Sequence, residues 1–440
     1  MFGRRLLVLL VILGALAIPA GALRATCAGR SCSGGSDAPA RIPFCSLPSA
    51  IKADLVAGFR QGRSPDILAV AAHALSGGTG QTGAQAPWPA LTPGPDTSVP
   101  LVFAGRGVDP AARVPRGTGL DQVAPTVARI LGFRRPHPEI PAGTAVPGVP
   151  DGTRPRLVLE IAWKGAGGAE LRRAPQAWPT LASLLRRGTG TLSGTTGSLP
   201  LDPTATLTTI GTGGPPSQHG ITGTLLRNRD GHLVHAWGPG SPPSVIPTLA
   251  DDVGRASDRA AMIGLVAATR SDRGIVGGTW YRGQDRDPVR LALGGAPVSR
   301  TRRLLATGFG RDGVPDILAV VLDGSIRSMD RRTRRVIAAA RQAAARSLLV
   351  VVAGTGSSAA DRGIGADEVA ARVEAGVPGG VDVIAGTVAG GIFLDQDALA
   401  TLRITGQTVT KAVLDARAPD GSPLFADAFQ GFAVSFARYC

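Results

Sequence analysis

Short strand-like runs alternate with helical segments along most of this 440-residue chain, and this alternation restricts the fold more than any other feature. The hexapeptide PDILAV occurs twice, at residues 65–70 and 315–320, and each copy is typical of a buried strand. Strands that alternate with helices favour a mostly parallel, doubly wound α/β sheet with helices on both faces. We predict that fold class here. Further strands are expected at residues 99–104, 156–162, 260–267, 348–353, 381–385 and 391–394, and helices at 52–61, 120–132, 179–188, 245–253, 331–346, 398–402 and 406–417.

A threonine-rich stretch, residues 198–228, combines a loop, a short helix, a tight turn and a strand. Asp202 is a suitable N-cap, and the residues from Thr204 to Ile210 can form about two helical turns. Backbone N–H groups at a helix N-terminus attract anions, so a threonine hydroxyl there could face a phosphate. On spacing alone, a capped surface helix is the simpler interpretation.

The same stretch carries a family resemblance. The segment GTGGPPSQHGITG is similar, without a gap, to the pattern TG-x-x-P-x-x-HGI-x-G of the alkaline phosphatase superfamily, in its type I phosphodiesterase/nucleotide pyrophosphatase branch. In that family a threonine upstream is the nucleophile. The resemblance implies that Thr204 takes this place after a small deletion, with Thr206 as the second candidate. It also implies a structural role for His219 in the HGI turn.

The blocks that resemble this family are out of their usual order. Residues 45–150, which include DTSVPL at 96–101, resemble the C-terminal part of the fold. Residues 151–440 resemble its N-terminal and central parts, and we expect one composite domain from the two segments. We infer a circular permutation, which folds tolerate when their natural ends lie close together.

The four cysteines are Cys27, Cys32, Cys45 and Cys440. In an exported chain this number suggests two disulfides. The inferred permutation places Cys45 and Cys440 on either side of a point where an unpermuted relative has continuous chain. We therefore predict a Cys45–Cys440 disulfide; the alternative pairs Cys45 with Cys27 or Cys32 and leaves Cys440 free.

The metal ligands that the resemblance implies are missing. The family holds two metal ions, usually zinc, with Asp and His side chains, and these ions activate the nucleophile. Ala162, Ser98, Thr355 and Gly356 stand at ligand positions here, and no Asp…His pair follows the strand at 315–320. We expect no cofactor. The alternative is a reduced zinc site built from the weak candidates Glu160, Asp323, Asp330 and His73.

The N-terminus has the pattern of a secretory signal peptide at residues 1–22, with Arg4 and Arg5 before an apolar run and AGA before the expected cleavage site. Residues 23–44 are expected to be a flexible lead. We expect a secreted or cell-envelope protein, with membrane contact only through an uncleaved signal.

The chain carries a formal net charge of +15, which favours anionic partners. Its arginines are scattered and aromatic residues make up only 4%, so no specific nucleic-acid surface is indicated.

Together these observations predict a catalytically inactive pseudoenzyme with an anion-binding cleft whose floor is Asp202, Thr204 and Thr206. Its partner would be an anionic or phosphorylated envelope component, or a protein. One alternative is a divergent metal-dependent phosphodiesterase or phosphatase that uses Thr204 as its nucleophile. Another is a purely structural envelope protein.

Overall fold

The computed structural model describes residues 42–79, 84–92, 96–136, 143–278, 280–281, 289–357 and 363–440, and residues 42–440 form one compact unit. The expected signal peptide, most of the expected lead, and Cys27 and Cys32 lie outside the described residues. No described helix is both long and apolar enough to cross a membrane.

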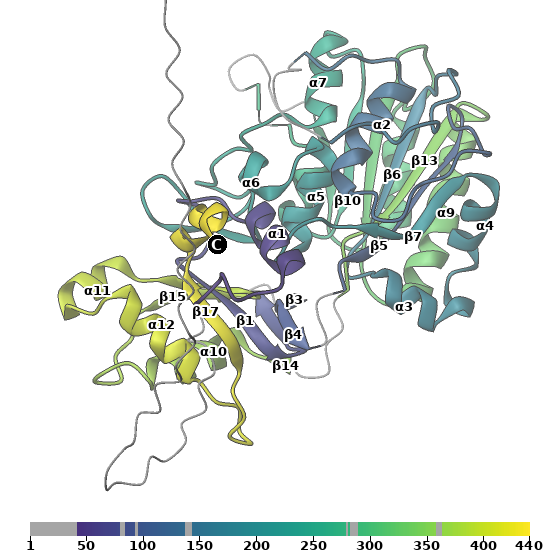
Figure 1. Cartoon of the computed structure of the whole chain (residues 1–440). Coiled ribbons are helices and arrows are strands. Elements are labelled where there is room, and N and C mark those ends of the chain that lie inside the picture. Colours follow the sequence, from purple (N-terminus) through teal and green to yellow (C-terminus); the bar gives the residue numbers. More distant parts are fainter. Residues whose placement is uncertain are drawn as a thin grey trace, which may run out of the picture. The chain divides into compact units, whose positions relative to one another are not determined.

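A seven-stranded sheet organises the larger part of the described chain (Figure 1). The strand order is β11 (Val289–Leu293), β10 (Ile263–Ala267), β12 (Asp316–Leu322), β6 (Leu157–Trp163), β13 (Leu348–Gly354), β5 (Ser98–Gly105) and β7 (Thr189–Thr195). The first five strands in this order are parallel to one another. β5 runs antiparallel to β13, and β7 runs antiparallel to β5. All seven residues of the central strand β6 are buried, as expected for a strand covered on both faces.

Helices cover both faces of this sheet. Buried apolar side chains of α2 (Val123–Ile130), α5 (Pro203–Thr212) and α7 (Leu249–Ala256) pack on one face. Those of α3 (Gly168–Arg173), α4 (Pro179–Arg187), α8 (Pro297–Ala306) and α9 (Ile326–Ala344) pack on the other. The predicted α/β class, with a mostly parallel sheet between two helical layers, is confirmed.

A second, mainly antiparallel sheet contains the first copy of the PDILAV repeat. Its order is β15 (Ile384–Val388), β16 (Gly391–Leu394), β1 (Ile67–His73) and β17 (Phe425–Gln430), with β4 (Ala90–Thr92) parallel to β1. Helices α10 (Ala366–Glu374), α11 (Gln396–Leu402) and α12 (Gly406–Asp415) share its core, and α1 (Ser49–Gly58) packs in a neighbouring cluster. The two copies of the repeat thus lie in different sheets, because an apolar run specifies a buried strand but not its partners.

The remaining elements are short. Two small sheets pair β14 (Gly363–Ile364) with β2 (Ser76–Thr79) and β2 with β3 (Ala84–Pro87), and β8 (Leu225–Arg227) with β9 (Leu233–His235). A four-residue helix, α6 (Pro216–His219), follows α5. The 3₁₀ turns are η2 (Leu120–Gln122), η3 (Pro175–Ala177), η4 (Arg270–Ile275) and η5 (Gly431–Tyr439).

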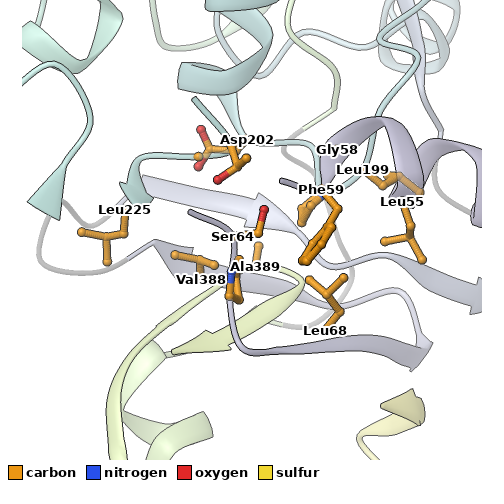
Figure 2. Close-up of a pocket in the computed structure, with 14 residues that line it drawn as sticks. Leu55, Gly58, Phe59, Ser64, Leu68, Leu199, Asp202, Leu225, Val388 and Ala389 are labelled. Carbon is orange, nitrogen blue, oxygen red and sulfur yellow. The ribbon is translucent and has the colours of Figure 1, made fainter. Parts of the chain in front are cut away.

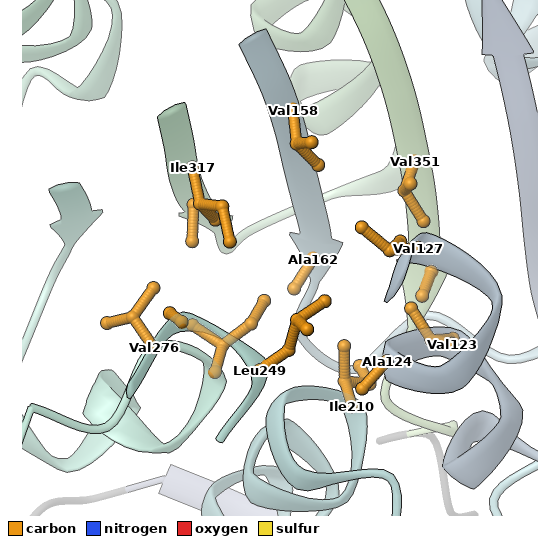
Figure 3. Close-up of a cluster of buried hydrophobic side chains, with 14 of the residues drawn as sticks. Val123, Ala124, Val127, Val158, Ala162, Ile210, Leu249, Val276, Ile317 and Val351 are labelled. Atoms are coloured by element: carbon orange, nitrogen blue, oxygen red, sulfur yellow. The ribbon is translucent and has the colours of Figure 1, made fainter. Parts of the chain in front are cut away.

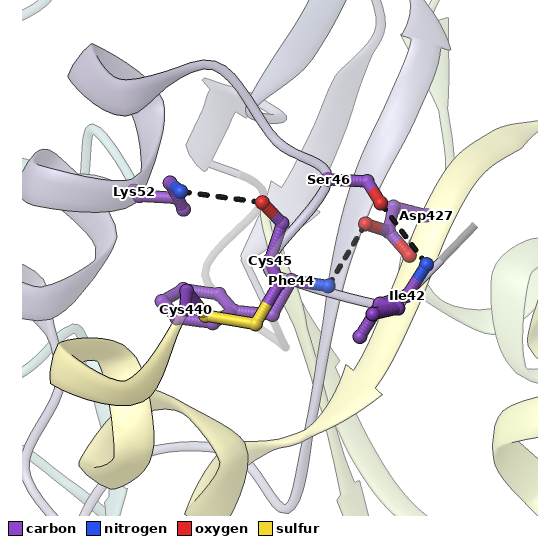
Figure 4. The surroundings of a disulfide bond; sticks show 7 residues. All are labelled: Ile42, Phe44, Cys45, Ser46, Lys52, Asp427 and Cys440. Carbon is purple, nitrogen blue, oxygen red and sulfur yellow. Dashed lines mark hydrogen bonds between the residues drawn. A yellow bond between two sulfur atoms is a disulfide. The ribbon is translucent and has the colours of Figure 1, made fainter. Parts of the chain in front are cut away.

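A disulfide joins Cys45 to Cys440, two residues that are 395 positions apart in sequence (Figure 4). Their Cα atoms lie 5.1 Å apart, within the usual range for a bridged pair. Beside it, the Cys45 carbonyl accepts a hydrogen bond from Lys52 Nζ, and the Asp427 carboxylate accepts one from the Phe44 backbone N–H. The predicted pairing is confirmed, and the alternative pairing of Cys45 with Cys27 or Cys32 is not adopted.

Candidate functional site

The N-terminus of α5 is closed by its own capping residue. Asp202 Oδ1 accepts hydrogen bonds from the backbone N–H groups of Thr204, at 2.8 Å, and Ala205, at 3.3 Å. The same carboxylate accepts from the backbone N–H of Thr224 at 2.9 Å and from its hydroxyl at 3.3 Å. Asp202 is only 4% exposed; this burial raises the pKa of its carboxyl group, and the hydrogen bonds oppose the rise. The backbone donors that would attract an external anion are therefore already used.

The two candidate threonines are buried and hydrogen-bonded. Thr204 Oγ1 lies 3.1 Å from Thr224 Oγ1, and Thr206 Oγ1 donates to the backbone carbonyl of Asp202 at 3.0 Å. Neither residue is more than 3% exposed. Back-bonding to the preceding helical turn is the usual way in which a threonine satisfies its hydroxyl within a helix.

The cavity beside Asp202 is small and mainly apolar (Figure 2). Leu55, Phe59, Leu68 and Leu199 contribute to its wall, and its volume is about 20 Å³. A site of this size holds about one water molecule. Asp202, Thr204 and Thr206 therefore lie together, as the sequence indicates, but their polar groups hydrogen-bond to one another and to nearby backbone rather than facing an open cleft.

His219, at the end of α6, is buried, and both of its ring nitrogens are in hydrogen-bond contact with neighbouring residues. Its Nδ1 accepts a hydrogen bond from the backbone N–H of Ile221 at 3.1 Å, and Nε2 lies 3.1 Å from Thr209 Oγ1. Since Nδ1 is an acceptor, the ring proton belongs on Nε2. Burial, together with the neighbouring Arg63 and Arg60, lowers the His219 pKa to about 3, so the ring is neutral at physiological pH.

Apolar side chains pack around the carboxyl end of β6. Ala162 is fully buried, and it belongs to one apolar cluster with Ile210 of α5, Leu249 of α7 and Val127 of α2 (Figure 3). Two of the other replaced positions make hydrogen bonds to distant segments: Ser98 Oγ accepts from Arg172, and Thr355 Oγ1 accepts from the Gly165 backbone N–H at 3.0 Å.

The four weak metal candidates lie in separate environments. Glu160 is in the middle of β6, between Ala319 of β12 and Val351 of β13. Asp330, on α9, accepts hydrogen bonds from the first N–H groups of α4. Asp323 pairs with Arg332 at 3.4 Å, and His73 ends β1 in the second sheet. Among the described residues, no three His, Cys, Asp or Glu side chains gather as a metal site would require.

Two polar contacts near this edge of the sheet were not anticipated from the sequence. Lys164, directly after β6, forms a 2.7 Å ion pair with the buried Asp272, which also caps η4. Thr224 completes the shell around Asp202. A lysine that immediately follows a buried strand, in a chain with only three lysines, was the available signal for the first contact.

Comparison with known proteins gives limited guidance. No family model matches the chain, and no curated protein matches it. Among solved structures it is similar to wild-type alkaline phosphatase PafA, with 14% sequence identity over 59% of this chain and 76% of that chain, at a TM-score of 0.41.

Proposed function

We propose that this chain is a non-catalytic relative of the alkaline phosphatase superfamily, in its type I phosphodiesterase-like branch, that works by binding. One observation carries the proposal. The carboxyl end of β6, where the sequence resemblance expects a cation held by an Asp, is instead packed with the apolar side chains around Ala162. Placing a divalent ion in such surroundings without charged ligands is strongly unfavourable.

The arrangement of the chain supports a circular permutation. β5, from the first segment, lies in the same sheet as β6, with β13 between them. Cys45 and Cys440 bring the two ends of residues 45–440 to a Cα separation of 5.1 Å. Ends this close are what a permuted fold requires.

The same disulfide supports an extracytoplasmic location, because such bonds persist in oxidising compartments. The net charge of +15 favours an anionic or phosphorylated envelope component as the partner over a neutral or cationic one. A protein partner is the second candidate.

Metal analysis of the purified protein, combined with hydrolysis of a chromogenic phosphodiester with and without added zinc, tests the loss of catalysis. We expect no stoichiometric metal and no turnover above background. Thr204→Ala and the matched Thr206→Ala variant serve as controls. Bound metal together with turnover that Thr204→Ala abolishes would instead identify a divergent hydrolase.

A further inference from the structure

A long groove lies on the sheet face opposite α5, between α4 and α9, with a volume of about 1060 Å³. One face of α4, from Pro179 to Arg187, forms one wall. One face of α9 from Arg334 onward, together with Ala345 directly after the helix, forms the other. The floor comes from β13, through Leu348 and Val350. At 1.5 Å per helical residue, these walls are about 12 to 17 Å long. The groove is therefore as large as a typical ligand site but more extended.

Five arginines line this groove against a single carboxylate. They are Arg106, Arg187, Arg334, Arg341 and Arg346. The carboxylate belongs to Asp151, whose Oδ1 already accepts two 2.7 Å hydrogen bonds from the backbone N–H and the hydroxyl of Thr153. The lining therefore has a strong excess of positive charge.

These guanidinium groups have no partner within the described part of the chain. None of the five takes part in an ion pair or a side-chain hydrogen bond there, and all five are exposed. The only acid in α9 is Asp330, whose carboxylate is engaged by the N-terminus of α4. Helical arginines are commonly neutralised by an acid one turn away. Arg341 has none in α9, and the acid one turn before Arg334 is the buried Asp330 itself.

The spacing of the charges selects the shape of the ligand. Arg334 and Arg341 lie two turns apart on one face of α9, about 10 Å along the helix axis. The five arginines are distributed along walls about 12 to 17 Å long, which is more than one phosphate group spans, so a chain of phosphates can contact more of them at once. No aromatic side chain lines the described groove, so the stacking platforms that bind single-stranded nucleic acids are missing.

We propose that the α4–α9 groove binds a linear, base-free polymer of phosphate groups, such as a phosphate-containing envelope polymer. This inference rests on the proposed binding function, and it assigns the ligand class and its site. Guanidinium groups would contact successive phosphates, and counterions would be released.

Titration of the whole protein with linear inorganic polyphosphate of about 15 units, followed by fluorescence or calorimetry over a range of salt concentrations, tests the proposal. We expect binding that weakens steeply with salt, and much weaker binding of orthophosphate. In R334Q/R341Q the affinity should fall about 10- to 100-fold, and the slope of log K against log salt should decrease by about 1.4.

R331Q/R335Q is the matched control, because it removes the same charge from the same helix at exposed positions outside the groove. It should bind nearly as the wild type does. A338E, at an exposed position in the wall, should block the groove and still fold, as circular dichroism can verify.

Equal losses in both double variants would overturn the assignment of the site. Tighter binding of an oligo-dT of equal charge, or binding to phosphatidylglycerol vesicles without polyphosphate binding, would overturn the ligand class. Neither result would affect the metal and turnover measurements, so the groove can fail while the non-catalytic proposal stands, and failure of the non-catalytic proposal is detected by turnover alone.

Discussion

At the scale of single residues, Glu160 is the most unusual feature of the larger sheet. It is 5% exposed, and it has no hydrogen-bond or ion-pair partner among the described residues. Burial raises its pKa from 4.5 to about 8, so the carboxyl group keeps its proton at neutral pH. The surrounding apolar side chains favour the neutral form of this carboxyl group, because burial penalises its charged form.

Glu160 gives the molecule a predictable pH dependence. Above pH 4.5 the unfolded chain loses this proton while the folded chain keeps it, so the free energy of unfolding falls as the pH rises toward about 8. The loss is on the order of 4 to 5 kcal/mol at 1.36 kcal/mol per pKa unit. Glu160→Met should remove this slope and stabilise the protein at pH 8, as measured by chemical denaturation.

Glu368→Met is the matched control, since Glu368 lies on an exposed face and pairs with Arg372. This variant retains Glu160, so the pH dependence that Glu160 produces between pH 4.5 and about 8 should remain. A wild-type stability that does not vary over this range would contradict the assigned burial of the Glu160 charge.

At the scale of elements, α5 is fixed by contacts at its N-terminus. Asp202 satisfies the first N–H groups of α5, and it also ties α5 to the segment around Thr224. The helix ends at Gly213, whose φ of +82° suits glycine. A cap that also holds a second segment should contribute more to stability than an isolated one.

Asp202→Ala should therefore lower the free energy of unfolding by about 2 to 4 kcal/mol, because it removes the cap and leaves buried donors unsatisfied. Asp395→Ala, at the exposed N-cap of α11, is the comparison and should cost about 1 kcal/mol. Thermal and urea unfolding measure both. Equal costs would mean that the contacts to Thr224 contribute nothing.

The elements also show how far the sequence alone could lead. Asp202 and the helix after it were predictable, because a cap and its helix are local in sequence. β7, with the sequence TGTLSGT, was not predicted, because its glycines and threonines lack a strand's apolar pattern. The two PDILAV copies lie in different sheets because the partners of each strand come from distant segments of the chain. The arginine groove was missed for the same reason: its five arginines come from three separate stretches, around Arg106, around Arg187 and within residues 334–346.

At the scale of the whole molecule, one covalent bond connects the beginning and the end of residues 45–440. Loss of a native disulfide that closes a long loop usually costs about 2 to 5 kcal/mol, in large part because the unfolded chain gains freedom. The loop that this bond closes contains both large sheets, and η5 and the segment before α1 flank the bond.

Cys45→Ser, Cys440→Ser and the double variant should each lower the free energy of unfolding by a similar amount, about 2 to 5 kcal/mol. Denaturation of the oxidised wild type with and without a reducing agent should reproduce that difference. Non-reducing peptide mapping provides the direct check. An unaltered stability in Cys440→Ser would contradict the pairing.

The bond also determines how the protein responds to mechanical load. A force applied at residues 45 and 440 is carried by the disulfide bond between them, so the sheets in the intervening chain bear almost no tension. Cutting that bond would allow the chain between the two cysteines, which are 395 positions apart, to extend by roughly 1,300 Å. A thiol-reducing environment would thus convert an inextensible tether into a long, extensible one.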